Sequence, residues 1–301
     1  MSPELTTAMT TTMTTTASRA LTGARRRAGL AVRARIAGDD AAARRQQIWH
    51  SEGERWNAPG DAIQTVNGDA SMFAAGLTAL LLQSLHPLAM AGVADHSDYR
   101  GDPWGRLQRT SQFIAVTTFG TITDASELIR GINNAHRAVV GTDYRGRPYD
   151  ARDPHLLQWV HVAEVWSFLE CHRLYGRTRL SPAQRDEYVR QASRTGLMLG
   201  ARDVPLTVAE LDSALERFRP ELEASPAALD ARRFLLDSPP VGWTDRPAYS
   251  LLREGAVAAL PPWAREMLAL RDGPFGSGPL ARQLGRTGVS TLRWVLDAID
   301  R

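Results

Sequence analysis

Two arginines and a threonine at helical spacing are the first residues of this sequence that suggest chemistry. Arg106, Arg109 and Thr110 lie in the run GRLQRT, and Phe113 follows one turn later. On a helix that begins near Pro103 these four residues share one face. The next turns, IAVTTF, are apolar, so we expect this face to be buried, where an unpaired guanidinium is costly. The pattern favours contact with a cofactor or substrate; the alternative is a solvent-exposed face whose arginines pair with acids.

A histidine on the apolar side of the next predicted helix, 125–140, could hold an iron atom. His136 is spaced at helical intervals from Ile129, Ile132 and Val139. Haem iron needs a neutral imidazole on a rigid helix in an apolar pocket, and haem propionates need cations such as the two guanidiniums. The alternative is a core histidine with one ring nitrogen bonded to the backbone.

The other candidate ligands are weaker. His86 and His96 each stand at a predicted helix end, where a structural hydrogen bond is the commoner role. His161 and Glu164 are one turn apart and could ligate a non-haem metal, but a ferritin-like di-iron site needs Glu-x-x-His on two helices. The single cysteine, Cys171, is expected to be an inert buried thiol. Any haem is therefore bound without covalent attachment.

Composition excludes several classes of protein. The 301 residues include 36 basic and 33 acidic side chains, and all of the basic ones are arginine, so no Schiff-base or phosphate-loop lysine exists. Motifs of nucleophilic hydrolases, zinc proteases and dinucleotide enzymes are missing as well. The arginines are interleaved with acids along most of the chain, and we therefore expect no nucleic-acid partner.

Helix start and stop signals recur along the chain, which predicts an all-α fold with one large domain over 41–301. Residues 1–40, with a threonine and methionine repeat, are predicted to be disordered or weakly helical. Charges interrupt the only N-terminal apolar segment, so we expect no export signal and a cytoplasmic protein. The longest apolar region is predicted to be a buried helix broken at His86 and Pro87, not a transmembrane span.

Three runs, LLLQSLHPLAMAGVADHSDYRGDPWGRLQRT, INNAHRAVVGT and YDARDPHLLQWVH, resemble in this order a family of haem-dependent oxygenases that includes the latex-clearing proteins and MpaB. The resemblance covers about residues 60–175. It implies a globin-like helical core around haem b, with His136 as the proximal iron ligand. It also implies that Arg106, Arg109 and Thr110 line the distal side, and that the reaction is cleavage of an isoprenoid carbon–carbon double bond by O2.

The sequence departs from the rubber-cleaving branch at Arg109, where that branch has a lysine. A guanidinium is almost never free to ligate iron, so we expect an open or water-bound sixth position. Without an export signal, polymeric rubber is a poor candidate substrate. The sequence thus predicts a haem b oxygenase that uses O2 on a small hydrophobic substrate of isoprenoid type. The alternative is a helical module that binds a hydrophobic or anionic ligand without chemistry; oligomeric state is not predicted.

Overall fold

The computed structural model describes residues 22–36, 38, 41–270 and 278–299. It confirms the predicted all-α class, because strand structure in these ranges is limited to the antiparallel hairpin of β1 (Val140–Thr142) and β2 (Pro148–Asp150). No strand was predicted at these residues. The helices are α2 (Ala41–Arg45), η1 (Gln46–His50), α3 (Ala62–Asn67), α4 (Met72–Gln83), α5 (Pro87–His96), α6 (Pro103–Phe119), α7 (Ile122–His136), α8 (Pro154–Tyr175), α9 (Pro182–Leu199), α10 (Val208–Phe218), η2 (Arg219–Glu221), α11 (Pro226–Leu236), α12 (Arg246–Ala259), α13 (Pro262–Met267) and α14 (Pro279–Leu296).

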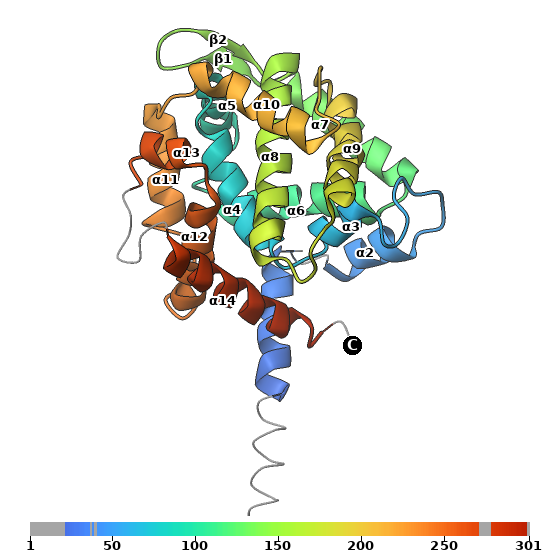
Figure 1. The fold of residues 1–301 in the computed structure, drawn as a ribbon. Helices are drawn as coiled ribbons and strands as arrows, with labels where there is room; N and C mark the ends of the chain where they lie inside the picture. Colours follow the sequence, from blue (N-terminus) through green and yellow to red (C-terminus); the bar gives the residue numbers. More distant parts are fainter. Residues whose placement is uncertain (1–21, 37, 39–40, 271–277, 300–301) are drawn as a thin grey trace, which may run out of the picture.

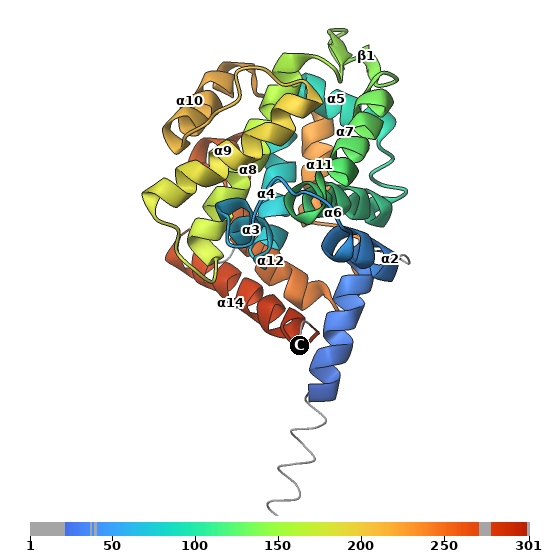
Figure 2. The same cartoon turned by 90° about the vertical axis from the view of Figure 1, so that its right-hand side faces the viewer.

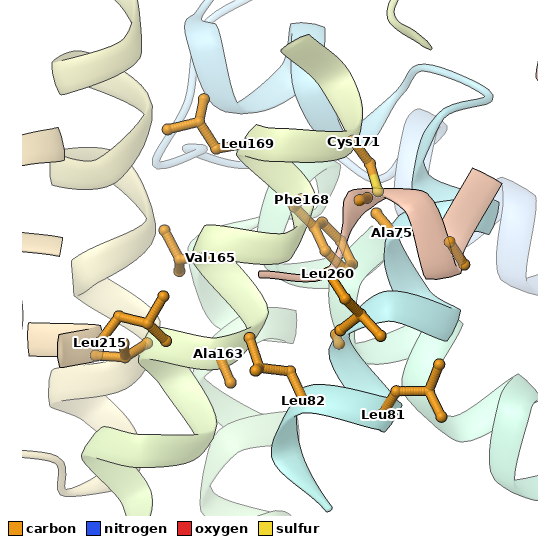
Figure 3. Close-up of a cluster of buried hydrophobic side chains, with 14 of the residues drawn as sticks. Ala75, Leu81, Leu82, Ala163, Val165, Phe168, Leu169, Cys171, Leu215 and Leu260 are labelled. Carbon is orange, nitrogen blue, oxygen red and sulfur yellow. The ribbon is translucent and has the colours of Figure 1, made fainter. Parts of the chain in front are cut away.

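The long helix α8 runs through the middle of the molecule with α4 packed along it (Figure 1). Its N-cap is Asp153, which accepts a hydrogen bond from the backbone of His155, and Gly176 follows its last residue, as the sequence predicts. Its buried apolar side chains lie mainly in one cluster that it shares with α4, α9, α10 and α12. Leu81 and Leu82 of α4 and Phe168 of α8 lie in this cluster (Figure 3).

The predicted break at the His-Pro step is present. α4 ends at Gln83, α5 begins at Pro87, and the two axes differ by 109°. Pro87 has no backbone N–H to donate and fits the first turn of a new helix. Among the described helices, none alone has the length and apolar character to cross a membrane; only the bent pair of α4 and α5 reaches that length and composition together.

The helices α6 and α7 pack against each other and form a side of the molecule with α2 and α3 (Figure 2). Asp102 caps α6, and Gly120 follows its end, in agreement with the sequence. α7 differs from the prediction at both ends. Its N-cap is Thr121, whose side chain accepts from the backbone of Asp124, one turn before the expected start. It ends at His136, because the chain turns there into β1.

Two segments in the second half of the chain were not predicted correctly. α12 was missed, and α14 begins at Pro279 although helix was expected only from 290. These two helices approach closely at glycines: a Cβ on Gly255 would lie 2.7 Å from the Cα of Gly285. Because no side chain larger than hydrogen fits at this crossing, the glycines act as contact surface here, not as helix terminators.

Part of the predicted tail is helical. Residues 22–36 form a helix that extends below the body of the protein in Figure 1. Its Arg25 donates to the carbonyl oxygen of Trp294 at 2.6 Å and lies over the ring of that residue. Near its other end, Arg35 contacts Asp245 and the ring of Trp104. These contacts agree with the helical alternative for this segment, whereas residues 1–21 lie outside the described residues.

Candidate functional site

His136 is the last residue of α7 and is half-buried. Its Nδ1 atom is buried and has no hydrogen-bond partner among the described residues. Burial lowers the pKa of this imidazole, and the negative charge of Asp150 only partly opposes the effect. The ring is therefore neutral at pH 7 with a nitrogen available, which is the state that a metal-ligating histidine requires.

Arg106 is the member of the arginine pair that lies in the interior. Its side chain is half-buried, and burial lowers the pKa of its guanidinium, with a smaller contribution from the charge of Arg109. The guanidinium donates to the hydroxyl of Ser97, just after α5, and no carboxylate of the described residues pairs with it. A partly desolvated cation without a counterion suits an anionic ligand group. No motif in the sequence points to Ser97.

Arg109 and Thr110 differ from the expectation of a buried face. The side chain of Arg109 is 65% exposed and pairs with Asp102 at 3.2 Å, and Thr110 is exposed. The hydroxyl of Thr110 donates to the carbonyl oxygen of Arg106 at 3.1 Å, within its own helix. The buried part of α6 begins only near Ile114. The polar face therefore projects partly into solvent, and the structure brings only Arg106 into the interior.

Part-exposed residues form a row along one face of α4 and adjoin an exposed residue of α8. On α4 these are Phe73, Gly76, Leu80 and Gln83, each part-exposed and spaced by three or four residues. On α8, Val160 is 37% exposed although the adjacent Trp159 is fully buried. Gln83 Nε2 donates to the carbonyl oxygen of Val160 at 3.1 Å, so Val160 adjoins the row on α4. We call these five residues, Phe73, Gly76, Leu80, Gln83 and Val160, the α4–α8 strip.

The strip includes room for a ligand at one position. A Cβ on Gly76 would meet no atom within 4 Å, although both neighbours of this glycine on α4 are buried. The strip is mostly apolar, and it lies on the two helices that form the core. Such an apolar, accessible face in the middle of a domain is typical of binding sites for hydrophobic molecules.

Glu164, one turn beyond Val160 on α8, is the second titratable group of interest. Burial raises the pKa of its carboxyl to about 7, and burial lowers the pKa of the nearby His161 to about 4. The Nε2 of His161 is buried without a hydrogen-bond partner among the described residues. In the described part of the chain, these two residues do not belong to any group of three or more potential metal ligands. Glu164 is instead a carboxyl that holds a proton near neutral pH, the property of a general acid or base.

Replacement of Glu164 with glutamine is expected to make the free energy of unfolding less dependent on pH. The pKa of Glu164 is higher in the folded than in the unfolded chain, so the wild-type protein loses stability as the pH rises from about 4.5 to about 7. The variant lacks this loss. Its free energy of unfolding should exceed that of the wild type by roughly 3 kcal/mol at pH 8 and be nearly equal to it at pH 4.5.

Guanidinium denaturation at the two pH values measures this difference. Glu127→Gln, on the exposed side of α7, is the control and should show no pH-dependent difference from the wild type. Equal stability of Glu164→Gln and wild type at pH 8 would show that the carboxyl of Glu164 titrates normally.

The remaining histidines separate into two cases. His96 Nε2 lies 3.2 Å from the hydroxyl of Tyr149, so the expected structural hydrogen bond at a helix end is present. For His86 that expectation is wrong: neither ring nitrogen has a hydrogen-bond partner among the described residues. Cys171 is buried, as predicted, and burial raises the pKa of its thiol to about 12, so it stays protonated.

The structure thus defines an all-helical domain that carries a neutral imidazole and a half-buried guanidinium on consecutive helices, and a part-exposed, mostly apolar strip on α4 and α8. Residues 64–294 match the family described as ER-bound oxygenase mpaB/B'/rubber oxygenase, catalytic domain. This chain belongs to that family, as the resemblance predicts, and the family supports an oxygenase function.

Individual relatives add little about the reaction. Uncharacterised proteins of Mycobacterium bovis and Mycobacterium tuberculosis are each 37% identical to this chain over 99 residues. The match covers 32% of this chain and 38% of each relative. No solved structure matches the chain at a significant level.

Proposed function

We propose that this protein is a haem b-dependent oxygenase in which His136 would hold the haem iron. The observation that carries the proposal is the neutral imidazole of His136, with a buried nitrogen that has no partner, inside an oxygenase catalytic domain. Arg106 fits the same group, because a haem propionate would give its guanidinium the anionic partner that the described residues lack. Bound haem would supply the iron that activates O2.

The proposed substrate is a small hydrophobic molecule with an isoprenoid-type double bond. The α4–α8 strip would bind its apolar chain and exclude water from it. Cleavage of the double bond by O2 gives two carbonyl products; each carbon of the former double bond receives one oxygen atom, and the bond supplies the electrons that reduce O2. The carboxyl of Glu164, one turn from Val160 of the strip, would hold or transfer a proton, and Arg109 and Thr110 would act on the substrate from the exposed face of α6.

Titration of the purified chain with hemin tests the cofactor. We expect a saturable Soret band with one equivalent of haem per chain. No saturable spectral change would contradict haem binding.

Oxygen uptake by the haem-loaded protein tests the reaction. Farnesol is a suitable probe, with its fully hydrogenated analogue as the control and hydrazine trapping of the carbonyl products. We expect uptake with farnesol alone. Haem binding without oxygen uptake on farnesol and other unsaturated isoprenoids would favour the non-catalytic binding module.

A further inference from the structure

Three potential metal ligands from separate parts of the chain converge away from His136. His86 lies at the break between α4 and α5, His155 in the first turn of α8, and Glu221 at the end of η2. Their metal-ligating atoms all lie within 4.8 Å of one another. The sequence analysis did not associate these residues, because 69 and 66 positions separate the successive members of the set in the chain.

The distances are close to those of ligands on one ion. Glu221 Oε2 lies 2.8 Å from His155 Nε2 and 3.6 Å from His86 Nε2. Two ligands bound about 2.1 Å from a tetrahedral ion are about 3.4 Å apart. Only a small shift of the His155 and Glu221 side chains, which are both exposed, would bring the three atoms around one ion.

His86 is the observation that calls for a ligand. It is 3% exposed, and neither of its ring nitrogens has a hydrogen-bond partner among the described residues. A buried polar group without a partner costs about 1–3 kcal/mol. The rings of Trp159 and Phe218 lie 6.2 and 6.4 Å from it and contribute no acceptor for its nitrogens. A metal ion beside Glu221 would give His86 a partner.

The charge around the cluster leaves Glu221 free to bind a cation. Among the described residues, its carboxylate is hydrogen-bonded to His155 and lies 3.6 Å from His86 Nε2, which is beyond hydrogen-bond distance. The neighbouring Arg147 pairs with Asp143 at 2.6 Å and with Glu223 at 2.9 Å. Its guanidinium is therefore neutralised by two other carboxylates and does not compete for Glu221.

One backbone hydrogen bond and one ring contact hold the three segments in place. The backbone N–H of Glu223 donates to the carbonyl oxygen of Leu85 at 2.8 Å, which fixes the segment after η2 against the break that carries His86. The ring of His155 lies 4.7 Å from that of Phe218 on α10. The segments that carry the ligands are thus held together without an ion. This lowers the cost of ordering the site when an ion binds.

We propose that His86, His155 and Glu221 form a binding site for a divalent transition-metal ion of the Zn²⁺ or Fe²⁺ type. Two imidazole nitrogens and one carboxylate oxygen are ligands that these ions favour. The ion takes the place of the proton shared by His155 and Glu221, and that proton is released to solvent on binding. Because His155 and Glu221 face solvent, the ion keeps a coordination position for water.

Calorimetric titration of the untagged, chelator-treated chain with Zn²⁺ tests the site, and the visible spectrum of the Co²⁺ form reports the ligand set. We expect one equivalent of Zn²⁺ to bind to the wild type. Each of His155→Ala and Glu221→Gln should weaken binding at least about tenfold, as loss of a direct ligand should exceed the effect of supporting groups. Both positions are exposed, so both variants should fold, which circular dichroism checks.

Two control variants distinguish this site from others. His50→Ala removes an exposed histidine elsewhere, and His136→Ala removes the proposed haem ligand; both should bind Zn²⁺ like the wild type. The proposal is overturned if the wild type shows no saturable binding, if either ligand variant keeps wild-type affinity, or if His136→Ala loses the binding. Its outcome is independent of the hemin titration.

Discussion

The His136→Ala variant is expected to show no saturable Soret band on titration with hemin and to have no oxygenase activity. The proposed axial ligand is removed, and alanine has no atom that can bind iron. Arg106 would still attract the propionates, so weak, non-specific association of haem can persist without the spectrum of an imidazole-ligated iron. Activity falls with the cofactor, because the remaining side chains cannot activate O2.

Loss of haem in this variant should not result from unfolding. His136 is only half-buried at the end of α7, and its Nδ1 makes no hydrogen bond whose loss would destabilise the fold. His136→Gln, which keeps more of the side-chain volume, is a second variant with the same expected result. His50→Ala, which removes an exposed histidine, should bind hemin like the wild type. An unchanged Soret band in His136→Ala would require another ligand, and His161 would be the first candidate.

The Arg293→Met variant is expected to lower the free energy of unfolding by about 3–5 kcal/mol, the cost of leaving a buried charge unpaired. Arg293 of α14 is 15% exposed and donates to Asp69, which is 8% exposed, at 2.8 and 3.1 Å. It also donates to the carbonyl oxygen of Tyr175 at 2.8 Å. One side chain thus joins α14 to the end of α8 and to the segment before α4.

The effect of Arg293→Met should depend on pH. Burial by itself would raise the pKa of Asp69, but hydrogen bonds from Arg293 and Ser71 outweigh it, and the pKa is lowered from its ordinary value of 3.8. The wild type keeps this stabilisation above about pH 4 and loses it as the pH falls through the lowered pKa. In the variant Asp69 is neutral in acid and needs no cation. The difference between variant and wild type should therefore shrink below pH 4.

Denaturant unfolding at pH 7 and at pH 3 measures the loss of unfolding free energy in Arg293→Met and its dependence on pH. Arg282→Met on the exposed side of α14 is the matched control and should change stability by less than about 0.5 kcal/mol. The double variant Asp69→Leu, Arg293→Met should be more stable than Arg293→Met alone, since it contains no unpaired buried charge. If Arg293→Met and Arg282→Met are equally stable at pH 7, the ion pair of Asp69 and Arg293 does not stabilise the fold as inferred.

The sequence alone was sufficient for the helices with local start and stop signals. Asp102 and Asp153 cap α6 and α8 because their side chains accept from backbone N–H groups within three residues. The break at Pro87 has an equally local cause. The family could also be recognised from the sequence, since its motifs lie in continuous runs of residues. By contrast, the end of α7 at His136 depends on the pairing of β1 with β2, which no signal inside that helix predicts.

Only the tertiary structure decided which polar side chains are buried and which meet. Helical spacing places Arg106 and Arg109 on one face, but the fold half-buries Arg106 against Ser97, just after α5, and leaves Arg109 in solvent. The cluster of His86, His155 and Glu221 forms because α5, α8 and η2 converge, and spacing along the chain carries no information about such contacts. The physical reason is range: caps and turns act over a few residues, whereas burial and charge pairing depend on distant segments brought together by the core.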